Sequence, residues 1–230
     1  SVRGIEYRSI NVLEDAAGLQ ELQALGARSV PVVSQNGRFV FAQLIKDVIE
    51  FLGLDEDAAP KLSPETLVER GDAIWTAAIR YCRQMPEAAL SKELPNRPRS
   101  YRVLLHHVFQ IPNAFLIARR DGSALAQKTL VAPPPDDIVD VDDIARFGEE
   151  IRQDFARWAE GEGETLGQDR MATYYGEQPT HEVLERTVWH SAQHVRQIMS
   201  LLEREGVAIN RPLSPEVLAG LPLPGPVWDS

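Results

Sequence analysis

The chain has 230 residues, a net charge of -10, 43% hydrophobic residues and 25% charged residues, as in an ordinary globular protein of one or two domains. Its lysines and arginines are scattered, which argues against a nucleic-acid partner, because neutralising phosphates requires clustered basic side chains. No apolar stretch approaches the roughly 20 residues that cross a bilayer, so we expect no membrane partner. The single cysteine, Cys82, excludes an internal disulfide, and we expect a cytoplasmic location.

Residues 1–54 show the mixed periodicity of an α/β unit. The expected elements are a strand, a helix, two strands joined by a hairpin and a helix: Ile5–Val12, Glu14–Leu25, Ser29–Val33, Arg38–Phe41 and Ala42–Leu52. Asn36-Gly37 is a strong signal for the hairpin turn, because both residues tolerate positive φ. An acidic stretch that ends at Pro60 follows, and residues 55–63 are therefore expected to be a linker.

Residues 64–206 are predicted to be nearly all helical. Four amphipathic segments have the apolar spacing of helices: Pro64–Gln84, Ser100–Arg120, Asp140–Ala159 and Thr180–Glu205. Four helices of this length satisfy the requirements of a four-helix bundle, and the proline-rich residues 207–230 are expected to be a tail on its surface. The predicted fold class is α+β with two domains, mostly α overall.

Histidines on two of these helices form a candidate metal site. The protein has five histidines. His190 and His194 are four residues apart, which places both imidazoles on one helical face. On the second helix, His107 falls on the inward seam, whereas the phase of His106 places it on the flank. The alternative is that these are core histidines with ordinary hydrogen-bond partners, since an isolated pair at this spacing is more often structural than metal-binding.

Three nitrogen ligands at His107, His190 and His194 would leave a coordination position open to water or substrate. That is the pattern of a catalytic metal site rather than of a closed structural one. The spacing does not choose among Zn, Ni, Fe and Mn, since imidazole suits all of them.

Two segments carry a resemblance to a known family. Leu104-Leu105-His106-His107-Val108 and the segment Trp189–Ile198 (WHSAQHVRQI) resemble the DinB/YfiT-like family over residues 64–206. The resemblance implies a four-helix bundle that often dimerises and a three-histidine metal site at His107, His190 and His194. It also implies chemistry of the kind found in that family, which includes metal-dependent thiol transferases and a thiol-dependent isomerase.

The N-terminal unit is similar to the second half of a glutaredoxin, a thioredoxin-fold protein. The segments that carry the similarity are Gly26–Val33 and Asn36–Val40. The resemblance implies that Pro31 is a cis proline beside a thiol site and that the backbone of Val30 binds the cysteine of glutathione or of another low-molecular-weight thiol. An edge-strand proline is the alternative for Pro31.

The N-terminal unit also departs from the glutaredoxin pattern. The family's first strand, first helix and Cys-x-x-Cys motif have no counterpart here, and we expect them to lie before Ser1. Phe41-Ala42-Gln43-Leu44 stands where glutaredoxins carry two glycines and acidic residues that hold glutathione. Cys82, on a predicted helix seam, is expected to be a buried and inert thiol.

The leading hypothesis is an enzyme that uses a divalent metal to activate a small-molecule thiol toward an electrophile, as a thiol S-transferase or a thiol-dependent isomerase. A homodimer through the bundle would be its form in solution. A redox or metal sensor without catalysis, in which the bundle serves for dimerisation, is one alternative. A disulfide oxidoreductase of the glutaredoxin type is the other, if a Cys-x-x-Cys motif precedes the chain.

Overall fold

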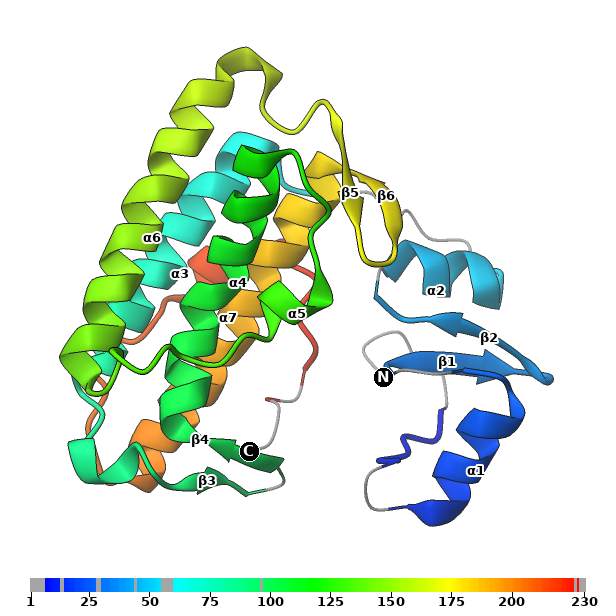
Figure 1. The fold of residues 1–230 in the computed structure, drawn as a ribbon, viewed down its shortest axis with the longest axis horizontal. Coiled ribbons are helices and arrows are strands. Elements are labelled where there is room, and N and C mark those ends of the chain that lie inside the picture. Colours follow the sequence, from blue (N-terminus) through cyan, green and yellow to red (C-terminus); the bar gives the residue numbers. More distant parts are fainter. Residues whose placement is uncertain are drawn as a thin grey trace. The chain divides into compact units, whose positions relative to one another are not determined.

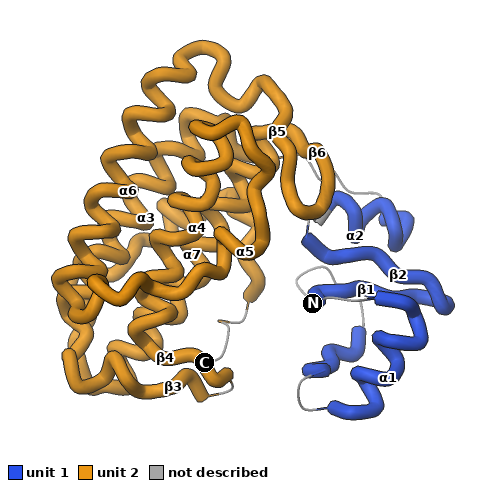
Figure 2. Tube along the Cα trace, viewed as in Figure 1, with its two compact units in different colours: residues 1–59 blue, residues 60–230 orange. Residues whose placement is uncertain are grey.

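The computed structural model describes residues 7–12, 15–27, 30–43, 45–54, 60–95, 97–225 and 227. The chain divides into two compact units, unit 1 (residues 1–59) and unit 2 (residues 60–230), which Figure 2 colours separately. Both helices and strands are present, so the fold is of the mixed α and β kind. In the described part of the chain, no helix combines the length and the apolar character needed to cross a membrane.

Unit 1 contains two short helices and a β-hairpin. Its elements are α1 (Ala16–Ala24), β1 (Val32–Gln35), β2 (Arg38–Phe41) and α2 (Ile45–Leu52). The strands are antiparallel, with Gln35 opposite Arg38, so Asn36 and Gly37 form a two-residue turn. Their φ angles of 53° and 73° are the positive values that the Asn-Gly signal predicts.

The prediction of a strand over Ile5–Val12 is wrong for the described part of that segment. Residues 1–6 lie outside the described residues, and residues 7–12 form no strand. A strand needs a hydrogen-bonded neighbour, and the described sheet of this unit contains only β1 and β2. The side chain of Ile10 instead lies against Gly18 of α1, in the space that a Cβ atom at Gly18 would need. The apolar residue of the alternating pattern is thus covered by a helix and not by a sheet.

Unit 2 is built on four long helices, which lie where the periodicity predicts. They are α3 (Pro64–Cys82), α4 (Tyr101–Asp121), α6 (Val141–Glu162) and α7 (Thr180–Arg204). Both α3 and α4 pack against α6 and α7, which gives the bundle arrangement seen in Figure 1. Short elements connect the long helices: η1 (Glu87–Ala89), β3 (Glu93–Leu94), β4 (Arg97–Ser100), α5 (Gln127–Leu130), η2 (Gly163–Thr165), β5 (Arg170–Thr173) and β6 (Gly176–Pro179).

Contacts at both ends show that α4 and α7 run in opposite directions. Lys92, just before β3, pairs with Glu205 at the end of α7 at 2.6 Å. At the opposite end, Arg119 in the last turn of α4 donates to the hydroxyl of Thr180, the first residue of α7, at 3.5 Å. The β3–β4 hairpin therefore lies near the C-terminal end of α7, and the β5–β6 hairpin leads directly into its N-terminal end.

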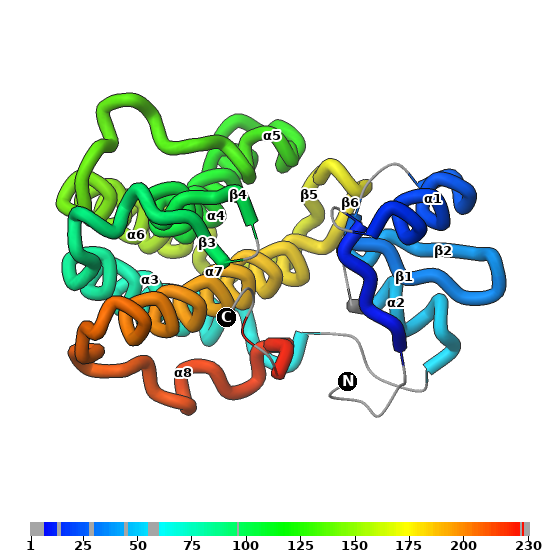
Figure 3. The backbone as a smooth tube through the Cα atoms, turned by 90° about the horizontal axis from the view of Figure 1, so that it is seen from below, coloured from blue at the N-terminus to red at the C-terminus, as the bar shows by residue number. Residues whose placement is uncertain are grey.

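The tail after α7 lies against two of the long helices. Its short helix α8 (Pro215–Leu218) contacts α3, and Figure 3 shows the segment passing along the bundle. Arg80 of α3 donates to the carbonyl of Asn210 at 2.9 Å. Arg196 of α7 donates to the carbonyl of Pro224 at 2.8 Å. The tail is thus held by arginine-to-carbonyl hydrogen bonds from the helices beneath it.

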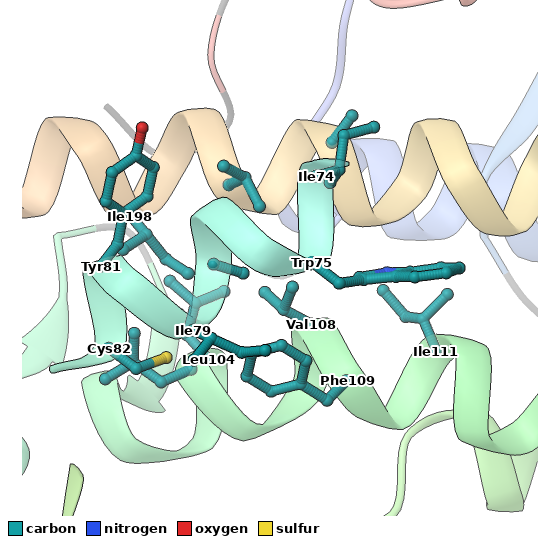
Figure 4. Close-up of a cluster of buried hydrophobic side chains, with 14 of the residues drawn as sticks. Ile74, Trp75, Ile79, Tyr81, Cys82, Leu104, Val108, Phe109, Ile111 and Ile198 are labelled. Carbon is teal, nitrogen blue, oxygen red and sulfur yellow. The ribbon is translucent and has the colours of Figure 1, made fainter. Parts of the chain in front are cut away.

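The interior of the bundle is a close-packed apolar core. Figure 4 shows side chains of α3, α4 and α7 converging in it, with Trp75 and Phe109 among the largest. A Cβ atom at Gly148 would lie 2.7 Å from the ring of Phe109, so the glycine lets α6 approach α4 closely. The ring centroid of Phe155 lies 4.6 Å from that of Trp75, which ties α6 to α3.

Replacing Phe155 by alanine should lower the free energy of unfolding of the bundle by about 3–5 kcal/mol, because it leaves a cavity among aromatic rings. Phe155 is 1% exposed and contacts Trp75, Phe115 and Trp158. Denaturant unfolding followed by tryptophan fluorescence measures the loss. Val131→Ala, at a side chain 53% exposed, is the matched control and should change stability little. Equal effects of the two substitutions would contradict this description of the core.

Candidate metal centre

Two neighbouring helices of the bundle carry the candidate ligands. His107 lies in the first half of α4, which begins after the N-cap Ser100. His190 and His194 lie one turn apart near the middle of α7. Beside them, the hydroxyl of Ser191, a fully buried side chain, donates to the carbonyl of Val108 at 3.2 Å. That hydrogen bond joins the two helices at the level of the three histidines.

The structure brings the three predicted ligands together. The ring centroid of His107 lies 5.6 Å from that of His190 and 5.1 Å from that of His194, and the two rings on α7 are 5.0 Å apart. Each residue offers one ring nitrogen such that the three atoms lie within 4.8 Å of one another. We call these three residues the histidine triad. The triad could hold a metal ion.

The charge state of the triad suits metal ligation, since an imidazole must be neutral to bind a metal ion. Burial is the main cause that lowers the pKa of His107 from its ordinary 6.5 to about 2, and that of His194 to about 4. Burial likewise holds the pKa of His190 well below its ordinary value. All three rings are therefore neutral at pH 7, with lone pairs available to an ion.

A glutamine fixes the orientation of one ring. The Nδ1 atom of His194 lies 3.0 Å from the Oε1 atom of Gln197, one turn further along α7. An amide oxygen only accepts hydrogen bonds, so Nδ1 carries the proton and Nε2 keeps its lone pair. A partner of this kind on the second nitrogen is the usual companion of a metal-binding histidine. Gln197 is therefore a positioning residue of the triad.

Replacing Gln197 by alanine should weaken metal binding by about 10–100-fold, the usual cost of losing such a partner, while the fold is retained. Competition with a chromophoric chelator measures the affinity. Gln110→Ala is the matched control, because Gln110 is also buried but donates instead to the carbonyl of Thr129. The control should bind the metal as the unaltered protein does. An unchanged affinity in Gln197→Ala, or an equal loss in the control, would contradict the role of Gln197.

The dimensions of the triad fit a divalent ion. Imidazole nitrogens bind Zn at about 2.0–2.1 Å in a tetrahedral site, which places ligand nitrogens about 3.4 Å apart. In the triad the three candidate ligand atoms lie within 4.8 Å of one another. His107 and His194 are buried, whereas His190 is partly exposed. An ion held by the three nitrogens would have a remaining coordination position for an exchangeable ligand.

His106 does not join the triad, in agreement with the position predicted from the helical spacing. The prediction that it lies on the flank of the helix is corrected, because the side chain is buried. It is 1% exposed and stacks on Phe147 of α6, with ring centroids 4.9 Å apart. Both ring nitrogens lack a hydrogen-bond partner among the described residues. Burial, followed by the charge of Arg102, lowers the pKa of this ring from 6.5 to about 4. The flank of α4 is interior because α6 covers it.

The remaining candidate residues lie apart from this triad in the sequence. The Val30–Pro31 peptide bond of unit 1 is cis, and both side chains are exposed. The chain's one cysteine, Cys82, is a fully buried free thiol of unit 2, and burial raises its pKa well above the usual range. The expectation that Cys82 is buried is therefore confirmed, and unit 1 has no cysteine of its own within this sequence.

The sequence-based predictions give no role to Ser191 or Gln197, although both lie beside the triad. The signal for Gln197 was its spacing, three residues after His194 on the same helical face. A comparison with known proteins adds no further residue: no family model, curated protein or solved structure matches this chain. The interpretation of the triad accordingly rests on its own geometry and chemistry.

Proposed function

We propose that the histidine triad holds a divalent metal ion, of the Zn, Ni, Fe or Mn kind, and that unit 2 is a metal-dependent enzyme acting on a low-molecular-weight thiol and a small electrophile. The single observation that carries the proposal is the approach of three neutral imidazole nitrogens to within 4.8 Å of one another. A bound ion of this kind supplies Lewis acidity, which lowers the pKa of a coordinated thiol or water. Three protein ligands leave a position for that group.

The state of Cys82 indicates whether the reacting thiol can come from the chain itself. Cys82, the only cysteine in this sequence, is fully buried, and its raised pKa keeps it protonated at neutral pH. A protonated, buried thiol is not a nucleophile. Thiol chemistry at the triad therefore needs an external small-molecule thiol such as glutathione. The resemblance of the two histidine segments to DinB/YfiT-like proteins, and that of unit 1 to glutaredoxins, favours this substrate class.

Direct binding of a thiol is tested with the Co²⁺-loaded protein. Titration with glutathione should produce a near-ultraviolet charge-transfer band, because a thiolate bound to the ion absorbs there whereas water does not. His190→Ala should abolish the band. His181→Ala is the matched control, since His181 lies on the same helix and its Nε2 atom instead contacts the carbonyl of Leu62 at 2.8 Å. The control should retain the band.

The transfer reaction is tested with glutathione and 1-chloro-2,4-dinitrobenzene as a probe electrophile. We expect a rate that requires the metal, falls at least about 100-fold in His190→Ala and is retained in His181→Ala. Equal rates with and without metal would overturn the proposal. A protein that binds metal but shows neither the charge-transfer band nor transfer would favour the alternative of a metal sensor.

A further inference from the structure

The carbonyl of Val108, the residue after His107 on α4, has no helical donor. In an α-helix each carbonyl accepts a hydrogen bond from the N–H four residues further along, and the residue four after Val108 is Pro112, inside the helix. Proline has no N–H, and its ring collides with a carbonyl in this position unless the helix bends to move it aside. Val108 is fully buried, so its carbonyl needs a donor from elsewhere in the protein.

A hydroxyl of α7 supplies that donor. Ser191 is fully buried and donates to the carbonyl of Val108 at 3.2 Å. A serine or threonine inside a helix can instead bond to the carbonyl four residues earlier in its own helix. Thr187, one turn before Ser191, does so, and its hydroxyl donates to the carbonyl of Val183 at 2.8 Å. Two hydroxyls on one face of α7 therefore differ in partner: one bonds within the helix and the other bonds to α4.

The hydrogen bond between the helices lies beside all three candidate ligands. Val108 directly follows His107 on α4. Ser191 directly follows His190 on α7 and precedes His194 by three residues. If the two helices moved apart or slid past each other at this bond, the spacing between the histidines of α4 and α7 would change by a similar amount. A metal site has to hold its ligands to within about 0.5 Å of the productive geometry, so the bond constrains the distance that matters.

Helix α6 holds the same stretch of α4 from another side. The ring of His106 stacks on Phe147 of α6, with ring centroids 4.9 Å apart. One turn further along α4, the ring of Phe109 lies where a Cβ atom at Gly148 would meet it at 2.7 Å. Packing against α6 thus fixes this part of α4 on one side, and the hydrogen bond to the carbonyl of Val108 fixes it to α7 on the other.

We propose that Pro112 and Ser191 form a positioning pair for the histidine triad. Pro112 leaves the carbonyl of Val108 available to α7, and Ser191 closes it with a buried hydrogen bond that sets how far α4 lies from α7. The pair thereby sets the spacing of His107 from the two histidines of α7. This inference rests on the proposed metal site and assigns the residues that adjust its geometry. Both residues act through the helices and the histidines.

Metal affinity and the visible spectrum of the Co²⁺-loaded protein test the positioning role. Ser191→Ala should weaken binding of Zn²⁺ and Co²⁺ about tenfold, the lower end of the loss seen when a ligand loses its supporting partner. It should also change the intensities of the Co²⁺ ligand-field bands, because these depend on the angles between the ligands. Thr187→Val is the matched control: it removes a buried hydroxyl of the same helix, but the acceptor of that hydroxyl keeps its helical donor. The control should leave both readouts unchanged.

A double-mutant cycle tests the part played by the proline. Pro112→Ala restores an N–H four residues after Val108, so the buried carbonyl no longer depends on Ser191 alone. The loss of metal affinity caused by Ser191→Ala should therefore be smaller in the Pro112→Ala background. Urea unfolding of the metal-free proteins should show the same coupling, because Ser191→Ala leaves a buried carbonyl without a donor only when the proline is present. If Ser191→Ala does not fold, Pro112→Ala should restore folding.

The outcomes separate this inference from the proposed function. Unchanged affinity and Co²⁺ spectrum in Ser191→Ala, equal effects in Thr187→Val, or no coupling to Pro112→Ala would each overturn the positioning pair while the metal site remained. Metal binding that depends on Ser191, without thiol transfer, would leave the pair standing and remove the proposed reaction. A protein that takes up no divalent metal would remove both.

Discussion

Replacing His190 or His194 by alanine should weaken binding of a divalent metal by more than about 100-fold, since losing only a residue that supports a ligand costs about 10–100-fold. The two rings face His107 with centroid distances of 5.6 Å and 5.1 Å. Removing either leaves at most two protein ligands for the ion. Metal content after gel filtration, measured by mass spectrometry, should fall from one ion per chain to a small fraction.

Stability gives an independent measure of the same loss. A metal that binds only the folded state adds about 4 kcal/mol to the free energy of unfolding at a concentration of about 1,000 times Kd. Urea unfolding should show that gain in the unaltered protein and in His181→Ala, but at most about 1.4 kcal/mol in His190→Ala or His194→Ala, because an affinity weakened 100-fold leaves the metal at only about 10 times Kd. A gain of the same size in the alanine variants of the triad would mean that the ion binds elsewhere.

The metal-free protein should lose stability steeply when the pH falls below 6.5. In the folded state, the pKa of His106 and that of His194 are lowered to about 4, and that of His107 to about 2, from the ordinary 6.5. Between these values the unfolded chain binds protons that the folded chain does not, so acid favours unfolding. A tenfold change in proton affinity corresponds to about 1.4 kcal/mol, so His106 alone contributes roughly 3 kcal/mol. That contribution is complete above pH 6.5 and is lost by pH 4.

Glu185 changes the pH dependence of stability in the opposite direction to the histidines. Burial raises the pKa of its carboxyl from 4.5 to about 7, so the folded state is protonated where the unfolded state is ionised. Its contribution is complete below pH 4.5 and is lost as the pH rises through 7. One such group offsets only part of the effect of the histidines, so the net change between pH 6.5 and 4.5 remains a loss of stability on acidification.

Guanidinium unfolding of metal-free protein between about pH 7.5 and 5 measures this dependence. His106→Phe keeps an aromatic ring against Phe147 but removes one titrating group, and should make the loss shallower by about one proton. Glu185→Gln removes the opposing group and should make it steeper. A stability that stays constant or rises as the solution is acidified over this range would contradict the buried, neutral state of these histidines.

The long helices were predictable because each has a strong signal of its own. The apolar period of α3, α4, α6 and α7 is sustained over 19 residues or more. The Asn36-Gly37 turn was equally clear, since few other dipeptides adopt two successive positive φ angles. The triad followed from the helices: once their faces are known, spacing decides that His107, His190 and His194 share the interior.

Two short hairpins and the burial of His106 were not predicted from the sequence. The β5–β6 hairpin turns at Tyr174-Tyr175, which is not a recognised turn dipeptide, and its strands have four residues each. The β3–β4 hairpin contains Pro98 and an irregular register, so no alternating pattern marks it. The burial of His106 depends on where α6 packs, and Phe147 of α6 lies far along the chain from this ring. Periodicity describes one face of one helix and does not contain this information.

The central claim is that one divalent ion binds to three imidazole nitrogens. X-ray absorption spectroscopy of the metal-loaded protein tests it most directly, because imidazole rings produce a distinctive multiple-scattering pattern around the absorbing metal. We expect a first shell of nitrogen and oxygen with three imidazoles, and a spectrum changed by His107→Ala, His190→Ala and His194→Ala but not by His181→Ala. A shell without imidazole, or one that the triad variants leave unchanged, would contradict the claim.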